Sequence, residues 1–178
     1  PALLTLELIG ALPQAVPARS GYADADAILL HGRDIGRQLN DAAQAGFAPV
    51  LAFRELDANG QPSRDPDFPE LPTTGERLTP RVRQPLFAAL DATIAATRLD
   101  TALVLPPLTS ASMVALWRRA CAQAIMAPAT RAAAARLGIH TEAEAAAVAS
   151  TAPLAAVDAA VLLDLRQWLA QRFGWHPS

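Results

Sequence analysis

Hydroxyl, glycine and arginine residues gather in three short segments of a kind that binds anions. The segments are 27–37 (AILLHGRDIGR), 109–114 (TSASMV) and 125–130 (IMAPAT). In each, an apolar run passes into a turn of small or polar residues that opens a helical pattern. Backbone N–H groups and hydroxyls face outward at such a junction, and the helix dipole favours negative charge there. The sequence therefore predicts a polar cleft for an anionic ligand.

Seven residues of these turns are the candidate ligand-binding set. Each offers a hydrogen-bond donor or a glycine backbone: Gly32, Arg33, Arg37, Thr109, Ser110, Ser112 and Thr130. Arginine can donate two parallel hydrogen bonds to one carboxylate. A structural role stays open for the same positions, with Asp34 and Ser110 as helix caps and the arginines in solvent.

Other kinds of site find no support in the sequence. The three histidines (His31, His140 and His176) lack metal-ligand spacing, so we expect no metal. Cys121 has no histidine partner at a fixed offset, which favours packing over nucleophilic catalysis. No glycine-rich nucleotide loop or serine nucleophile elbow is present.

Composition narrows the partners and the compartment. The formal net charge is −2 and no basic stripe is present, which argues against nucleic acid. No apolar run has the length of a membrane span, so we expect no membrane partner. A single cysteine suits a reducing compartment, and the expected location is the cytoplasm.

The elements that must position the turns follow from hydrophobic periodicity. Strands are expected at 3–9, 27–31, 48–53, 101–105 and 124–126, and helices at 35–45, 85–98, 111–122, 128–137 and 153–173. Residues 139–145 fit either a strand or a capped helix, and a strand suits the alternation better. Because room for a helix separates successive strands, we expect an α/β fold: an open, mainly parallel sheet with helices on both faces.

A proline-rich stretch divides this pattern. Residues 57–80 hold five prolines and an Asn-Gly pair, too irregular for a tight turn. We expect part of an α/β lobe over 1–56, a connector without a core of its own over 57–80, and a second α/β lobe over 81–178. One continuous domain over 1–178 is the alternative.

In this order the motifs resemble the uroporphyrinogen-III synthase family, mainly its C-terminal half. Residues 28–39 (ILLHGRDIGRQL) are similar to its strand, Gly-Gly-Arg-type turn and helix. Residues 109–114 match its Thr-Ser-x-x-x-Val turn, and 127–130 (APAT) are similar to its Gly-Pro-x-Thr turn. The chain departs at Ala127, where the family has glycine, and at Phe53, where it often has tyrosine.

The resemblance implies a flavodoxin-like fold and a cofactor-independent lyase of porphyrin and heme biosynthesis. Such an enzyme cyclises the linear tetrapyrrole hydroxymethylbilane with inversion of one pyrrole ring. The substrate carboxylates would meet the three turns, which would frame one cleft. No catalytic residue is assigned, and Phe53 implies low activity. The alternative is a non-catalytic ligand-binding or partner-binding domain of the same fold, so enzyme activity itself stays open.

Overall fold

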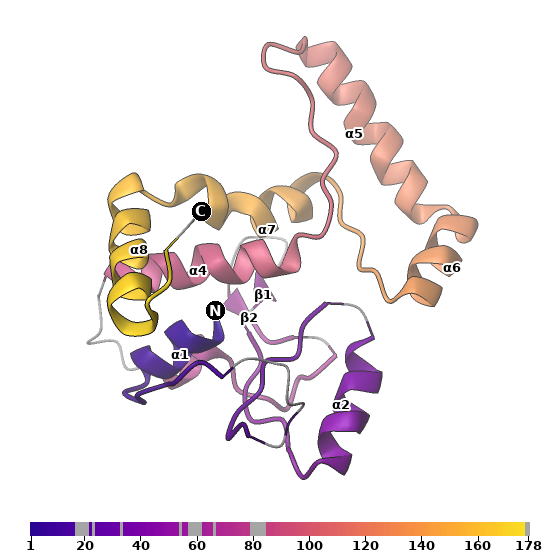
Figure 1. The fold of residues 1–178 in the computed structure, drawn as a ribbon. Helices are drawn as coiled ribbons and strands as arrows, with labels where there is room; N and C mark the ends of the chain where they lie inside the picture. Colours follow the sequence, from indigo (N-terminus) through magenta and orange to yellow (C-terminus); the bar gives the residue numbers. More distant parts are fainter. Residues whose placement is uncertain are drawn as a thin grey trace.

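The computed structural model describes residues 1–178 except 17–21, 23, 33, 54, 57–61, 66, 79–84 and 177–178. Helices dominate this part of the chain (Figure 1). They are α1 (Ala2–Leu8), α2 (Ile35–Gln44), α3 (Thr74–Arg77), α4 (Pro85–Arg98), α5 (Ala111–Met126), α6 (Pro128–Leu137), α7 (Glu144–Ala156) and α8 (Ala159–Phe173). Two short strands, β1 (Glu55–Leu56) and β2 (Pro62–Ser63), pair antiparallel.

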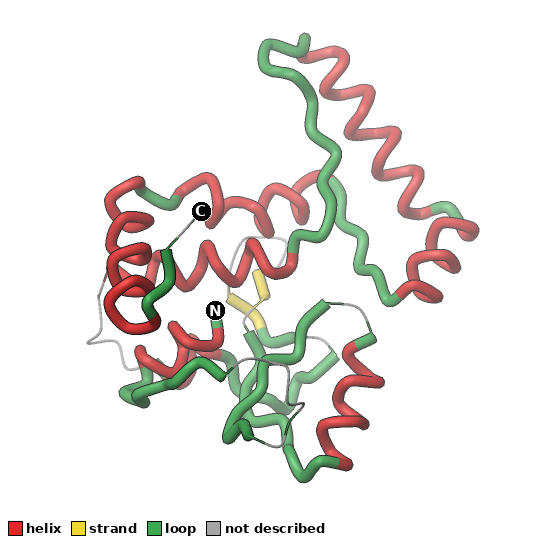
Figure 2. The backbone as a smooth tube through the Cα atoms, viewed as in Figure 1, coloured by secondary structure: helices red, strands yellow, loops and turns green. Residues whose placement is uncertain are grey.

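The predicted open, mainly parallel sheet with helices on both faces is wrong. Over the described residues, the one ladder is the β1–β2 pair. Ala52 and Thr73 form a single parallel bridge, with the Ala52 amide donating to the Pro72 carbonyl at 3.1 Å. Loops instead occupy most of the N-terminal half (Figure 2). A flavodoxin-like α/β architecture is therefore excluded for this structure.

Two of the expected strands are helical. Residues 3–9 fall largely in α1. Leu4 and Leu8 are four residues apart, a spacing that places them on one face of a helix as well as on one face of a strand, and both enter the core. Residues 124–126 continue α5, since no breaker precedes Ala127. Ala127 then leaves the helix at ψ 132°, as expected for a residue before proline.

The remaining expected strands, 27–31, 48–53 and 101–105, lie in loops, apart from the single bridge at Ala52. A strand needs a neighbour about 4.8 Å away to pair its backbone. Residues 101–105 run out along a projection of the molecule, where Leu103 and Val104 are exposed. An apolar run without such a neighbour stays unpaired.

Helices with local start and stop signals are confirmed. Ser110 caps α5 by accepting a hydrogen bond from the Met113 amide, and Gly46, Gly138 and Gly174 take positive φ after α2, α6 and α8. The expected single helix over 153–173 is two helices, α7 and α8, because Asp158 caps a new start. Residues 139–145 form no strand, and α7 begins at Glu144.

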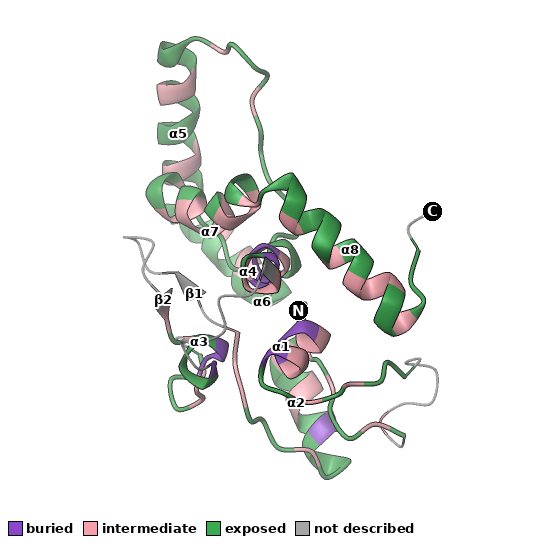
Figure 3. Cartoon of the chain, turned by 90° about the vertical axis from the view of Figure 1, so that its left-hand side faces the viewer, coloured by how far each residue is buried: buried purple, intermediate pink, exposed green. Residues whose placement is uncertain are grey.

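The core surrounds α4, which packs on α7 and α8 and on α1 (Figure 1). Its buried residues are Leu4, Leu8, Leu78, Leu90 and Ile94. Leu78 shows that the end of the proline-rich connector contributes to this core. Buried residues lie on or beside α1 to α4, whereas α5 to α8 have none among the residues described (Figure 3).

The helices α5 and α6 pack on each other and project from the other helices (Figure 1). We call residues 101–141, which comprise this hairpin and most of the two loops that carry it, the arm. The C-terminal end of the arm, after α6, lies close to the start of α2. A Cβ on Gly138 would lie 3.4 Å from the Asp34 amide nitrogen at the start of α2.

Candidate functional site

The three predicted turns serve mainly as helix starts. Ser110 caps α5 and lies 3.2 Å from the Ser112 hydroxyl, and Thr109 donates to the Pro106 carbonyl at 2.7 Å. Asp34 stands at the cap position of α2 but accepts no capping bond, and its carboxylate is 3.9 Å from Arg37. The structural alternative is therefore confirmed for the cap at Ser110, whereas the expected cap at Asp34 makes no capping bond.

The structure does not gather the seven predicted residues. Gly32 and Thr109 line one large open space, which is described below. Arg37, Ser110, Ser112 and Thr130 do not line that space. Arg33 lies outside the described residues. Ligand binding by this set stays a prediction.

The hollow itself is the most distinctive feature of the surface. We use this name for a space of about 3120 Å³ between the arm, the N-terminal loops and the core helices. Its walls include the loops 11–16, 24–32 and 46–53, the inner side of α5 and the start of α7. Small-molecule pockets usually hold about 300–1,000 Å³. The hollow is therefore of a size that suits part of a macromolecule.

The charge of the hollow is negative. Among the described residues, seven carboxylates and three arginines line it. Asp24 and Asp26 are exposed on the N-terminal wall, and Asp65 lies half-buried there. The Tyr22 and Phe47 rings pack edge-on with their centroids 5.7 Å apart. This contact holds Tyr22, two residues before Asp24, against the loop 46–53. A cationic ligand is favoured at this wall.

Large apolar side chains stand exposed around the same space. Leu12 is 79% exposed, Val50 is 77% exposed and Leu108 is fully exposed. Leu108 also holds a φ of 65°, a backbone region that costs a leucine roughly 1–2 kcal/mol. All three side chains line the hollow, and exposed apolar surface is a feature of interaction sites. Sequence reasoning missed the exposure of Val50, because the run 48–53 was assigned to a sheet that would have buried it.

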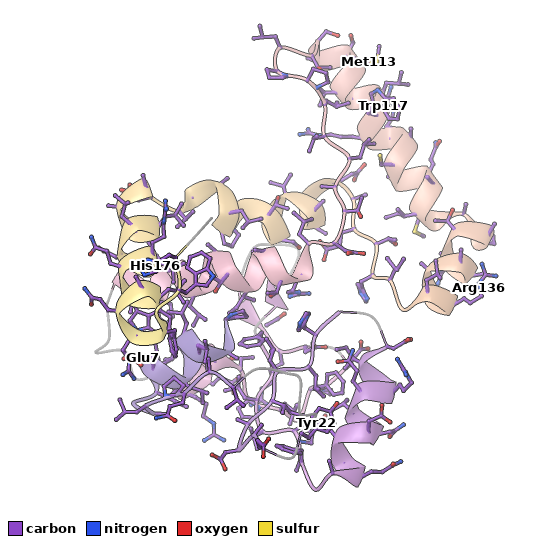
Figure 4. The ribbon with its side chains drawn as sticks, in the orientation of Figure 1. Glu7, Tyr22, Met113, Trp117, Arg136 and His176 are labelled. Atoms are coloured by element: carbon purple, nitrogen blue, oxygen red, sulfur yellow. The ribbon has the colours of Figure 1, made fainter. Side chains whose placement is uncertain are left out.

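Apolar exposure continues on the arm. Met113, Leu116 and Trp117 of α5 are all exposed. Figure 4 labels Met113 and Trp117 near the start of α5, the part of the arm that stands clear of the other helices. These side chains therefore contribute little to the fold.

The electrostatic pair that shapes the proline-rich connector lies beside the hollow. Arg64 donates to both carboxylate oxygens of Glu76, at 2.9 and 2.8 Å. Hydrogen bonding to Arg64 lowers the pKa of the Glu76 carboxyl. Arg64 also donates to the Pro69 carbonyl at 2.8 Å, so the pair ties the loop before α3 to α3.

The described residues hold neither a candidate metal site nor a single membrane-spanning helix. No group of three metal-ligating side chains is found there. No single helix there is long and apolar enough to cross a membrane; α7 and α8 pass that test only as a pair bent by 71°. No protein-family model, curated protein or solved structure matches the chain.

Proposed function

We propose that this chain is a polypeptide-binding protein that takes a cationic, amphipathic helix into the hollow. The observation that carries the proposal is the lining of the hollow, where carboxylates outnumber arginines and large apolar side chains stand exposed. A helix with arginine or lysine on one face and leucine on the other complements both properties.

The size of the hollow agrees with one helix. A helix of 16 residues is about 24 Å long and about 10 Å across, which gives about 1900 Å³. The hollow offers about 3120 Å³. The volume of one such helix is therefore smaller than that of the hollow.

A peptide titration tests the proposal. The probe is a labelled synthetic helix with one leucine face and one arginine face, of a sequence unrelated to this chain. We expect a Kd of about 10 μM, or about −7 kcal/mol. The matched peptide with glutamate in place of arginine should bind at least about tenfold more weakly, because it meets like charge. Equal binding of the two peptides, or none, contradicts the proposal.

Two variants assign the binding to the hollow. Asp24→Asn/Asp26→Asn should weaken the arginine peptide several-fold, since it removes two carboxylates from the N-terminal wall. Asp164→Asn is the matched control, because Asp164 is exposed on α8 and does not line the hollow. Its binding should equal that of the wild type.

Tetrapyrrole cyclisation stays a prediction of the sequence resemblance. Its support is the order of the three motifs along the chain. Hydroxymethylbilane is a polycarboxylate, however, and the excess of carboxylates in the hollow repels it. We therefore favour the binding function.

A further inference from the structure

We infer that the helix that fills the hollow belongs to the arm of a second copy of this chain. The inference rests on the proposed function and names its partner.

The arm is a purely cationic segment. From residue 101 to residue 141 the chain has four arginines and no carboxylate. Arg118 and Arg119 lie on α5, and Arg131 and Arg136 lie on α6, all exposed. None of the four has an ion pair among the residues that the structure describes. The arm therefore offers positive charge, of which Arg118 lines the hollow of its own chain and the other three arginines do not.

The helix α5 is also amphipathic in the required sense. At 100° per residue, Met113, Leu116 and Trp117 fall on one half of the helix. Arg118 and Arg119 fall on the other half. All five side chains are exposed. Trp117 and Arg118 line the chain's own hollow, whereas Met113, Leu116 and Arg119 do not.

The N-terminal half of the chain has the opposite net charge to the arm. Residues 1–78 contain eleven carboxylates and six arginines, a net charge of −5, against +4 for the arm. Two copies of such a chain attract when the arm of one meets the N-terminal half of the other. A reciprocal exchange of arms closes the assembly as a two-fold dimer.

The arm cannot fill its own hollow. Val114, Trp117, Arg118, Cys121 and Ile125 of α5 already form one wall of that space. At the far end of the arm, Gly138 lies close to the start of α2, since an added Cβ there would be 3.4 Å from the Asp34 amide nitrogen. The helix that enters must therefore come from another molecule.

Charge reversal tests the inference by sedimentation velocity on the full chain. The wild type should sediment as a dimer at micromolar concentration. Arg118→Glu/Arg119→Glu should be monomeric, because it lowers the net charge of the arm from +4 to 0 and places two carboxylates of α5 against an acidic hollow. Asp24→Arg/Asp26→Arg should be monomeric, because it takes the charge of the hollow from −4 to 0 and places two arginines on the N-terminal wall opposite the arginines of the arm. An equimolar mixture of the two variants should restore the dimer, because the new carboxylates on the α5 of one variant then meet the new arginines on the N-terminal wall of the other, and the unchanged basic arm meets the unchanged acidic wall. Each reversal alone should raise the dissociation constant at least about tenfold.

Controls separate charge from folding. Arg166→Glu, exposed on α8 and outside the hollow, should leave the dimer unchanged. Circular dichroism verifies that each variant keeps its helices. If a reversed variant fails to fold, the wild type still tests the inference, because its dimer should weaken between about 50 mM and about 1 M salt.

Each other outcome overturns the inference. A wild type that stays monomeric at the highest concentration overturns the inference. In that case the peptide titration decides the proposed function: binding of the arginine peptide supports it, and no binding contradicts it. A dimer that survives both reversals, or is not restored by mixing, places the interface elsewhere. A monomer that binds vesicles of phosphatidylserine and phosphatidylcholine assigns the arm to a lipid surface instead.

Discussion

At the scale of single residues, Thr5 is the clearest test of packing. Its side chain is buried on α1 among leucines, and its hydroxyl has no hydrogen-bond partner among the described residues. Valine keeps the branched shape and removes the desolvated hydroxyl. We predict that Thr5→Val raises the free energy of unfolding by about 1 kcal/mol, measured by urea denaturation.

Thr93→Val is the matched control for this prediction. The Thr93 hydroxyl donates to the Leu90 carbonyl at 2.8 Å on α4. The same substitution there removes a bond and should not stabilise. Destabilisation by Thr5→Val would show that its hydroxyl does find a partner.

The Arg64–Glu76 pair predicts a pH dependence. Because the pairing lowers the pKa of Glu76 in the folded state, its contribution to stability is present above the ordinary carboxyl pKa of 4.5. That contribution is lost as the pH falls through the lowered value. Glu76→Gln should therefore lower Tm at neutral pH and match the wild type at the acid end. An equal Tm deficit at every pH would contradict the pairing.

At the scale of elements, α4 carries the fold. Leu90 is 1% exposed at the centre of the leucine cluster. Leu90→Ala should cost about 3 kcal/mol through lost burial and the cavity left behind. Leu163→Ala on α8 should change stability by less than about 0.5 kcal/mol, because that side chain is half exposed. Similar losses from both substitutions would mean that α4 is not the centre of the core.

Local signals made some elements predictable from the sequence and left others ambiguous. Ser110 and Gly138 mark helix ends by their own chemistry, so α5 begins and α6 ends where the sequence placed them. Leu4 and Leu8 satisfy the strand and helix periods at once, and only packing against α4 decides between them. The sheet failed because pairing is a property of neighbours, which the sequence does not show.

At the scale of the whole molecule, the sequence could have predicted the charge of the arm but not the hollow. The absence of carboxylates from 101 to 141 is a signal that composition alone could have found. The hollow depends on how α5 stands away from the N-terminal loops, which no local pattern encodes.

The charge of the hollow also predicts the outcome of a tetrapyrrole assay. We expect the isolated chain to leave only the type I ring product of hydroxymethylbilane, formed at the uncatalysed rate, because the hollow repels the substrate carboxylates. Product analysis after incubation with and without protein measures this. Type III product above the protein-free level would contradict the expectation and support the synthase prediction.

Hydrogen exchange at two protein concentrations tests the central claim most directly. If the arm of one copy occupies the hollow of another, the amides of α5 and of residues 24–30 should gain protection together as concentration rises. The amides of α4 should not change, because the core is complete in each copy. Unchanged exchange in α5 and residues 24–30, under conditions where the chain self-associates, would contradict the account.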